Sequence, residues 1–502
     1  MSGTETLERT TSASSNKVEH FDVLVVGAGI SGIGAAYHLK TQNPDKTFVV
    51  LDKFETFGGT WHTHKYPGIR SDSDLYTFGY RFKPWVGAPI ATAAEIKSYM
   101  NEVIDENDLK RHIRYRHRIE KASWSSKTNL WTVTATNLAT NEAVTFTTNF
   151  MFMGSGYYNH EKGYTPQWKG MDKFKGKIVH PQHWPENLDY KGKRVVVIGS
   201  GATAATVIPA IAADVEHVTM LQRSPTYFIP GLNRNELADM LAPLDLDPML
   251  VHQIVRKKIL HDAGELTRRS FEEPEALTAE LLEAVKMFVG EDIAKKHFTP
   301  TYRPWRQRIA FVPEGDIFQG IASGRASVVT DEIDSFVEDG IKLKSGEVLK
   351  ADIVVTATGF DLCVMGDIKF SVDGKSVSWP DTINYRGMMF TGVPNLIWVF
   401  GYFRASWTLR VDLLGDFFAR LLKKMDEKGA RQVRVALRPQ DSNMPLLDWI
   451  DSENFNPGYL TRSMHLLPKR GDKPEWMHNQ DYWAERNEIP AIDLDGAEFV
   501  YS

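Results

Sequence analysis

The chain has 502 residues, of which 42% are hydrophobic and 25% are charged, and its formal net charge is -5. This length is too great for one compact core and predicts two or three domains, while the lack of a basic excess argues against a nucleic-acid surface. No apolar run approaches the roughly 18 residues that a membrane helix needs, so we expect no membrane insertion.

Residues 1–19 are polar and rich in Ser, Thr and Glu, and they lack the apolar core of a signal peptide. They predict a disordered arm. The only cysteine is Cys363, which excludes an intramolecular disulfide, a redox dithiol and a thiolate zinc cage. Together these features favour a cytoplasmic protein.

The first nucleotide-binding pattern follows the arm. Residues 21–26 predict a buried parallel strand, a GxGxxG loop and a helix come next, and the apolar run 47–51 ends at Asp52. Such glycines let the backbone approach a pyrophosphate at a helix N-terminus, and the acid accepts hydrogen bonds from a free ribose 2′-hydroxyl. The pattern predicts an FAD or NAD site; its glycines are Gly27, Gly29 and Gly32.

The loop FETFGGTWHTHKYPGIRSDSDLY continues from this site. Its glycines allow close approach of backbone to a ligand, and its aromatic residues could pack on a flavin ring. We expect Arg70 to be a structural partner or a solvated cation, and the alternating His62 and His64 to be exposed rather than metal ligands. The candidate flavin contacts in this loop are Gly59, Thr60, Trp61, Tyr66 and Asp72.

A polar, turn-prone run, FKGKIVHPQHWP, spans residues 174–185 between two nucleotide-binding patterns. Its HxxH core could suggest a metal, but no further ligands cluster nearby and Pro181 disfavours a helix that presents both histidines on one face. We therefore predict no metal, and interpret the run as an interdomain linker anchored by His180 and Trp184.

The nucleotide-binding pattern recurs. Residues 194–198 predict a strand, GSGATA follows as the alanine-ended variant of the loop, and the next strand ends in Gln222-Arg223-Ser224 with no acid. An arginine suits a ribose 2′-phosphate because its guanidinium forks onto phosphate oxygens. The pattern predicts an NADP site that includes Gly199, Gly201, Ala202, Thr203, Arg223 and Ser224.

The remaining chain completes two α/β domains. Residues 227–298 show helical periodicity and no evident strand, which predicts a helical insertion. Strand-like runs then lead to Thr358 and Gly359, where we expect a further cofactor contact. The predicted fold is α/β with two Rossmann-like dinucleotide-binding domains. The FAD-binding domain is expected at 20–155 and 385–502, and the NADP-binding domain at 156–226 and 299–384.

Several motifs resemble the type I Baeyer–Villiger monooxygenases. The family fingerprint FxGxxxHxxxWP is matched here, GGTWHTHKYPGIRSD resembles its GGxWxxxxYPGxxxD loop, and TATGF resembles its ATG segment. The segments GYYNHEKGYTPQW and ASWTLRVDL are most similar to the ethionamide-activating subgroup. The fingerprint residues are Phe174, Gly176, His180, Trp184 and Pro185.

The resemblance implies an activity. NADPH would reduce FAD, O₂ would add to give a C4a-peroxyflavin, and attack on a ketone would yield an ester or lactone, with sulfide oxidation as a further activity. By motif position Arg308 would be the arginine beside the flavin, and Asp72 the acid that holds it. Gln307 replaces a lysine that many members use toward the NADP phosphate, which leaves the strictness for NADPH open. We expect a small ketone and O₂ as substrates, and a monomer or weak homo-oligomer.

Three alternatives differ in class. An N- or S-oxygenating flavin-containing monooxygenase would use the same cofactors, but Trp184-Pro185 counts against its usual fingerprint. A pyridine nucleotide–disulfide reductase needs a dithiol, which one cysteine cannot supply. A non-enzymatic flavin-binding sensor would not couple NADPH consumption to a ketone and O₂.

Overall fold

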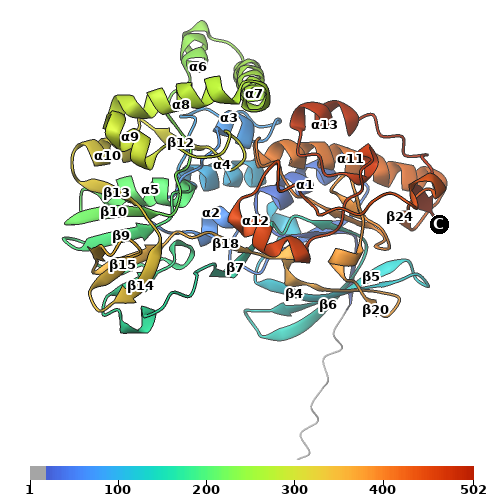
Figure 1. The fold of residues 1–502 in the computed structure, drawn as a ribbon. Coiled ribbons are helices and arrows are strands. Elements are labelled where there is room, and N and C mark those ends of the chain that lie inside the picture. The colour runs from blue at the N-terminus through green and yellow to red at the C-terminus, as the bar shows by residue number, and fades with distance from the viewer. Residues whose placement is uncertain (1–17) are drawn as a thin grey trace, which may run out of the picture.

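Two sheets lie side by side in the computed structural model, which describes residues 18–502, and a layer of helices runs above them (Figure 1). The predicted arm lies almost entirely outside the described residues. Glu19, the last residue assigned to the arm, begins β1 and forms an ion pair with Arg114, so the first strand starts slightly earlier than predicted.

The first sheet has the order β20-β19-β4-β5-β6-β1-β2-β3, and β23 also pairs with β6. β1 pairs in parallel with both β2 and β6, so its apolar residues are buried on both faces. The strands are β1 (Glu19–Val26), β2 (Phe48–Leu51), β3 (Ile113–Arg114), β4 (His117–Ser125), β5 (Leu130–Asn137), β6 (Glu142–Met153), β19 (Lys369–Val372), β20 (Lys375–Ser376) and β23 (Leu396–Trp398).

Helices from both ends of the chain cover one face of this sheet. α1 packs closely along α11: a Cβ on Gly34 would lie 2.7 Å from the Val411 side chain, and a Cβ on Gly415 would lie 2.4 Å from the His38 ring. The C-terminal segment thus belongs beside the first sheet in space. Helices of this half are α1 (Ile30–Gln42), α2 (Thr60–Thr63), α3 (Leu75–Phe78), α4 (Ala93–Glu106), α11 (Trp407–Lys428), α12 (Gly458–Ser463) and α13 (Tyr482–Glu488).

The second sheet is parallel throughout, with the order β13-β10-β9-β17-β8. Its central strands are continuous apolar runs, as expected for a sheet buried on both faces. The elements are β8 (Lys177–Val179), β9 (Arg194–Ile198), β10 (His217–Gln222), β13 (Ala326–Thr330), β17 (Ile353–Thr356), α5 (Ala202–Ile211) and α10 (Asp316–Ala322).

Short sheets complete the fold. The meander β14-β15-β16 lies beside the second sheet, and the pair β7-β18 connects the two halves of the molecule. The strands are β7 (Tyr158–Gly163), β14 (Ile333–Val337), β15 (Gly340–Leu343), β16 (Val348–Lys350), β18 (Phe360–Leu362), β21 (Asn384–Tyr385), β22 (Met389–Phe390), β24 (Val433–Val435) and β25 (Phe499–Tyr501).

The structure differs from two strand expectations. Residues 369–376, expected in the NADP-binding domain, form β19 and β20, and β19 pairs with β4 at the edge of the first sheet. The insertion, for which the sequence predicts no strand, contains β11 (Phe228–Gly231), which pairs with β12 (Ala310–Pro313). β11 is only four residues long and includes a proline and a glycine, so its pattern is obscured.

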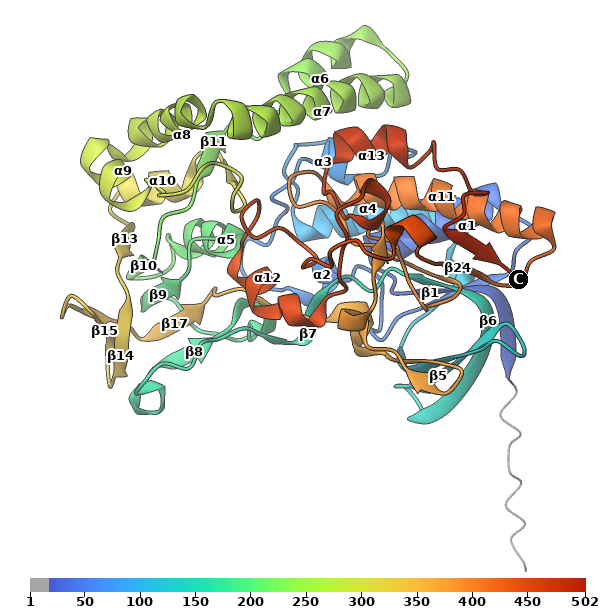
Figure 2. The same cartoon turned by 45° about the vertical axis from the view of Figure 1, so that its right-hand side comes forward.

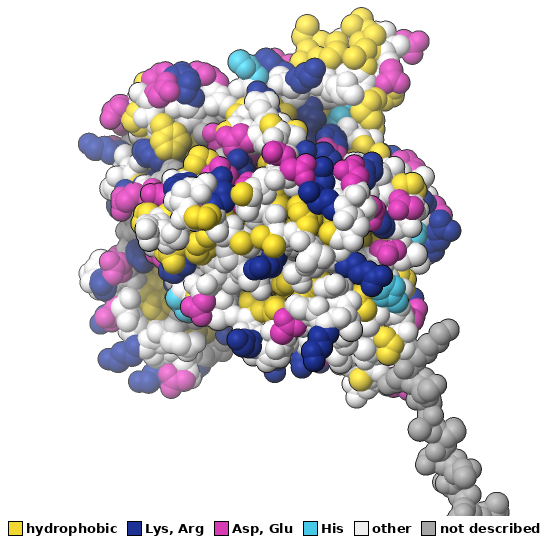
Figure 3. All heavy atoms as spheres, turned by 90° about the vertical axis from the view of Figure 1, so that its right-hand side faces the viewer, with side chains coloured by type: hydrophobic (Ala, Val, Ile, Leu, Met, Phe, Trp, Pro, Cys, Tyr) yellow, Lys and Arg dark blue, Asp and Glu magenta, His cyan; other side chains and the backbone are white. Residues whose placement is uncertain are grey.

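The rest of the insertion is helical and forms the upper layer seen in Figure 2. One contact that fixes this layer on the first half is made by Arg256 of α7, whose Nη1 donates to the carbonyls of Tyr76, Thr77 and Gly79. The helices are α6 (Glu236–Leu241), α7 (Pro248–Glu272), α8 (Pro274–Val289) and α9 (Glu291–His297). Hydrophobic side chains gather at its tip (Figure 3), among them Leu232, Met240, Leu244 and Leu250.

Among residues 18–502, every helix is too short or too polar to span a lipid bilayer. The same residues contain no group of three or more His, Cys, Asp or Glu side chains arranged to hold a metal ion.

Candidate active site

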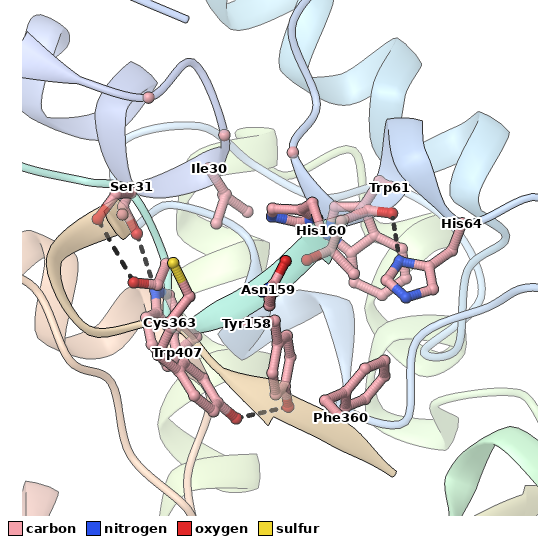
Figure 4. Close-up of a pocket in the computed structure, with 18 of the residues that line it drawn as sticks. Ile30, Ser31, Trp61, His64, Tyr158, Asn159, His160, Phe360, Cys363 and Trp407 are labelled. Carbon is pink, nitrogen blue, oxygen red and sulfur yellow. Dashed lines mark hydrogen bonds between the residues drawn. The ribbon is translucent and has the colours of Figure 1, made fainter. Parts of the chain in front are cut away.

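A cavity of about 950 Å³ lies between the two halves, and both nucleotide-binding loops line it. Figure 4 shows part of its lining. Most residues predicted from the sequence to form the site meet here. They are Gly27, Gly29, Asp52, Gly59, Thr60, Trp61, Tyr66, Asp72, Gly199, Gly201, Ala202, Thr203, Arg308, Thr358 and Gly359.

The first loop joins the end of β1 to α1. Gly29 caps α1 without any side-chain hydrogen bond, which leaves the helix N-terminus open toward the cavity. Gly27 has φ 97°, and a Cβ on Gly32 would lie 1.7 Å from the Gly27 carbonyl oxygen. Gly32 therefore lies beneath the loop, where the close packing leaves no room for a side chain, whereas Gly29 borders the cavity. This arrangement could hold a pyrophosphate.

Asp52 lies at the end of β2, beside that loop. It is 6% exposed and accepts hydrogen bonds from the backbone amides of Ala28 (2.6 Å) and Phe54 (2.8 Å). Burial raises the pKa of Asp52, and the two amide donors oppose that shift. Both carboxylate oxygens keep lone pairs for further donors, so Asp52 could bind a ribose diol.

The second loop repeats this geometry at the end of β9. Gly199 has φ 126°, and a Cβ there would lie 2.3 Å from the Ala357 carbonyl oxygen. A Cβ on Gly201 would have no atom within 4 Å, and this glycine caps α5 without a side-chain bond. The helix N-terminus is again open to a phosphate. Arg223 and Ser224 follow β10, are exposed, and do not line the cavity.

The loop that contains residues 58–74 bridges the two halves. A Cβ on Gly68 would lie 2.7 Å from the Ala210 Cβ, so this backbone approaches α5 closely. Arg70 forms an ion pair with Asp316 of α10 at 2.7 Å, which agrees with the first of its two expected roles, structural partner rather than solvated cation. His64 is 3% exposed, which overturns its predicted exposure, because its Nδ1 hydrogen-bonds to the Thr60 carbonyl within the turn.

Arg308 and Asp72 form a bidentate ion pair at the same junction. Nε donates to Asp72 Oδ2 at 2.6 Å and Nη2 donates to Oδ1 at 2.9 Å, while Nη1 donates to the Phe403 carbonyl at 3.3 Å. Burial by itself would lower the pKa of Arg308, but the Asp72 charge and hydrogen bond outweigh it and raise that pKa. The arginine side chain keeps 38% exposure because it faces the cavity. A fixed cation is therefore available there.

A tyrosine cluster beside this pair is absent from the residues predicted from the sequence. Tyr157 and Tyr158 follow the end of β6, and their hydroxyls lie 2.5 Å apart. Tyr459 of α12 completes the cluster, and burial raises the pKa of all three phenols, which therefore remain protonated near neutral pH. Figure 4 shows Tyr158 within the cavity beside Phe360, with ring centroids 4.1 Å apart. The sequence does contain a signal for Tyr157 and Tyr158. They follow the carboxyl end of β6, and ligands of α/β folds bind at the carboxyl ends of parallel strands.

The fingerprint run lies outside the cavity. Part of it is β8, the edge strand of the second sheet, so the run is built into that sheet rather than being only the anchored interdomain linker that the sequence predicts. His180 follows β8; its Nδ1 accepts from the Gln182 amide, which leaves Nε2 to donate to the Gly359 carbonyl at 3.1 Å. His180 thus holds the Thr358-Gly359 segment, which does line the cavity.

The other fingerprint residues pack in the second half. Phe174 is buried between the second sheet and the meander, and a Cβ on Gly176 would lie 2.3 Å from the Asp352 carbonyl oxygen. Trp184 packs edge-on against Tyr190. These residues support the sheet that carries the second loop.

Comparison with known protein families agrees with this architecture. The model "Flavin-binding monooxygenase-like" matches residues 90–262, and "NAD(P)-binding Rossmann-like domain" matches residues 25–86. Two dinucleotide loops facing one cavity, with these matches, define a flavin-dependent monooxygenase.

Curated relatives show the family. The chain is 44% identical over 483 residues to the FAD-containing monooxygenase EthA of Mycolicibacterium smegmatis, covering 95% of this chain and 96% of the relative. It is 41% identical over 479 residues to the probable FAD-binding monooxygenase AlmA of Acinetobacter baylyi, covering 95% of both. The chain belongs to this family of FAD-containing monooxygenases.

Solved structures share the fold. A steroid monooxygenase bound to NADP superposes with a TM-score of 0.73 at 23% identity, covering 96% of this chain and 99% of that one. OTEMO in complex with FAD and NADP gives a TM-score of 0.74 at 21% identity, covering 97% of this chain and 100% of that one.

Proposed function

We propose that this monooxygenase inserts one oxygen atom of O₂ next to a ketone carbonyl and releases an ester or lactone. The observation that carries the proposal is the bidentate Arg308–Asp72 pair in the cavity between the two nucleotide loops. A guanidinium that stays charged at any working pH can stabilise negative charge that develops during oxygen transfer.

The residues fit both cofactors. The first loop with Asp52 suits the adenosine diphosphate part of FAD, because the helix N-terminus is uncapped and the carboxylate is positioned for a free ribose diol. The second loop suits NADPH, and Arg223 and Ser224 at the end of β10 would contact its 2′-phosphate. Bound flavin would supply the activation of O₂, and the chain would orient the reactants and exclude water.

Asp72 would position Arg308 rather than exchange protons. It holds two nitrogens of the guanidinium, and the third donates to the Phe403 carbonyl, so the guanidinium plane is fixed. Fixing a donor before reaction removes the cost of reorienting it as charge develops. Trp407, whose Nε1 donates to Ser31 at 2.7 Å, would form part of the ketone-facing wall with Tyr157, on which it stacks.

N- or S-oxygenation is the second candidate. The flavin-binding monooxygenase-like match over residues 90–262 is compatible with it, since that description specifies no substrate class. A substrate with a nucleophilic nitrogen or sulfur atom would use the same cofactors. Its oxygenation forms no carbonyl adduct whose negative charge must be stabilised, so it should depend less on Arg308.

The test is a product assay on the purified FAD-loaded enzyme with NADPH and O₂. A panel of linear, cyclic and aryl ketones is compared with matched thioethers of the same chain length. Esters or lactones one oxygen heavier than the ketone, formed in step with NADPH consumption, support the proposal. Sulfoxides as the only products would establish the second candidate instead.

A further inference from the structure

A second cavity, of about 570 Å³, lies between α7 and the segment that leads into α13. One wall is formed by Arg404, Asn454, residues 479–481, Trp483 and Arg486, and the other by residues of α7 that lie between Lys257 and Phe271. It shares no lining residue with the first cavity.

One charged side chain of this cavity is almost fully buried. Arg404 is 8% exposed, and its Nε and Nη2 donate only to uncharged oxygens, those of Trp305 and Asn454 at 2.7–3.2 Å. Within residues 18–502, no carboxylate lies within ion-pair distance of Arg404, and Nη1 has no hydrogen-bond acceptor. Burial and then Arg303 lower the pKa of Arg404 to about 10, so it remains a cation at neutral pH. Asp481 opposes this shift from beyond ion-pair distance. A buried cation with no carboxylate in direct contact favours binding of an anion.

The rim adds further positive charge. Lys257 and Arg486 line the cavity, are exposed, and have no ion-pair partner among the described residues, and His261 lies on the same face of α7. Arg268 also lines it but is neutralised by Glu265 and its neighbours. The other acid of the lining, Asp481, accepts from the Ala484 amide as the cap of α13. Asp481 adds one formal negative charge, but Lys257, Arg404 and Arg486 outnumber it, so the cavity has an excess of positive charge.

Aromatic surface lies next to these cations. Phe271 is 47% exposed, and the guanidinium groups of Arg303 and Arg404 lie 4.1 Å and 5.2 Å from its ring centroid. Trp483 lines the same cavity and donates its Nε1 to the Leu260 carbonyl, so its ring is fixed in place. A ligand with an acidic head and an apolar tail would contact both kinds of surface.

We propose that this second cavity binds the carboxylate of an amphipathic carboxylic acid, with Arg404 as the buried partner, Lys257 and Arg486 at the rim, and Phe271 and Trp483 along the apolar part. Arg404 lies between Phe403 and Ala405, which line the first cavity, so the bound head group would sit directly behind the wall of the active site. This inference does not depend on which oxygenation reaction the enzyme performs.

The probe is octanoate, titrated by calorimetry into the enzyme loaded with FAD and NADP⁺, with octan-1-ol and inorganic phosphate as comparison ligands. We expect octanoate to bind, the neutral alcohol to bind at least about tenfold more weakly, and phosphate to compete poorly. The double variant Lys257→Gln/Arg486→Gln should weaken octanoate binding by about tenfold or more, since hydrogen bonds to charged groups contribute most. Arg404→Gln should abolish it, with the thermal midpoint recorded alongside to show that the variant is folded.

The matched control is Lys258→Gln, which removes the neighbouring charge on α7, one that pairs with Asp262 and does not line the cavity. Its octanoate affinity should stay within about twofold of the wild type. Equal affinity in the double variant and the wild type would overturn the assignment. So would alcohol binding as tight as octanoate. Phosphate binding as tight as octanoate would show a simple anion site and overturn the amphipathic ligand.

Discussion

At the scale of single residues, the central feature is one arginine that combines a fixed geometry with access to the cavity. Asp72 comes from the loop after β2 and Arg308 precedes β12, so the pair joins segments 236 residues apart. Replacing Arg308 leaves Asp72 without its charged partner in a partly enclosed site, which costs free energy as well as charge stabilisation.

Arg308→Ala should still accept electrons from NADPH, because the nucleotide loops are unchanged, but it should form ester at least about a thousandfold more slowly. Stopped-flow flavin absorbance measures the first step, and gas chromatography of the product measures the second. Arg306→Ala is the control: this arginine pairs with Glu453 and does not line the cavity. Ester formation at the wild-type rate by Arg308→Ala would contradict the role given to this residue.

Arg223→Ala should raise the apparent KM for NADPH by about tenfold or more and leave that for NADH nearly unchanged, because only NADPH has the 2′-phosphate. Steady-state oxidation of the two cofactors measures this ratio. Arg325→Ala is a suitable control, since Arg325 is exposed at the opposite, amino-terminal end of the neighbouring strand β13. Equal changes in both KM values would remove Arg223 from the phosphate site.

At the scale of elements, the two nucleotide loops each combine a glycine that the fold requires with one that borders the cavity. In the second loop the first of these is Gly199, which has φ 126° and where a Cβ would lie 2.3 Å from backbone, and the second is Gly201, which has open space around it. Their replacement should therefore have opposite consequences.

Gly199→Ala should lower the free energy of unfolding by about 1–3 kcal/mol, because a positive φ and a backbone clash both oppose a side chain. Gly201→Ala should change that free energy by less than about 0.5 kcal/mol, yet weaken NADP⁺ binding by about tenfold, since its methyl group would point where the pyrophosphate approaches. Chemical denaturation and calorimetry separate the two effects. A stability loss in Gly201→Ala with unchanged NADP⁺ affinity would reverse the assignment.

The elements that could be predicted from the sequence are those whose pattern is local. β1, α1, β9 and α5 follow a buried strand, a glycine loop and a helix in order, and the structure has them where expected. β8, β11 and β19 are each three or four residues long, and each is defined by a partner far along the chain, so no local periodicity marks them.

The same distinction between local and long-range features applies to the residues of the site. Gly29, Asp52 and Gly201 can be predicted because a motif fixes their place relative to a strand. The tyrosine cluster as a whole cannot, because Tyr459 is brought to Tyr157 from α12, across most of the chain. His180 is identified by its motif, but its action through the Gly359 carbonyl requires the structure.

At the scale of the whole molecule, burial of histidines links stability to pH. Burial lowers the pKa of His160 and His252 to about 4, and lowers those of His64, His180 and His478 as well. The folded protein therefore binds fewer protons than the unfolded chain. The resulting stability is fully present above the unfolded value near 6.5 and is lost as the pH falls toward 4.

The free energy of unfolding should thus decrease steeply between pH 6.5 and 4 in urea titrations. His252 alone contributes up to about 3 kcal/mol over this range, from a pKa difference between 6.5 and about 4. His252→Gln should flatten the profile by that amount, while His261→Gln, an exposed position on the same helix, serves as the control. A profile of unchanged steepness in His252→Gln would show that this histidine is not held neutral.

The two halves meet at one cavity, joined by the loop of residues 58–74 and by the Arg308–Asp72 pair, and we propose that this junction serves oxygen insertion into a ketone. The most direct test is a single-turnover series of the FAD-loaded enzyme with NADPH, a ketone and ¹⁸O₂, analysed by mass spectrometry. The predicted result is an ester that contains one labelled oxygen for each NADPH consumed. Label found only in hydrogen peroxide or in water, with the ketone unchanged across the panel, would contradict it.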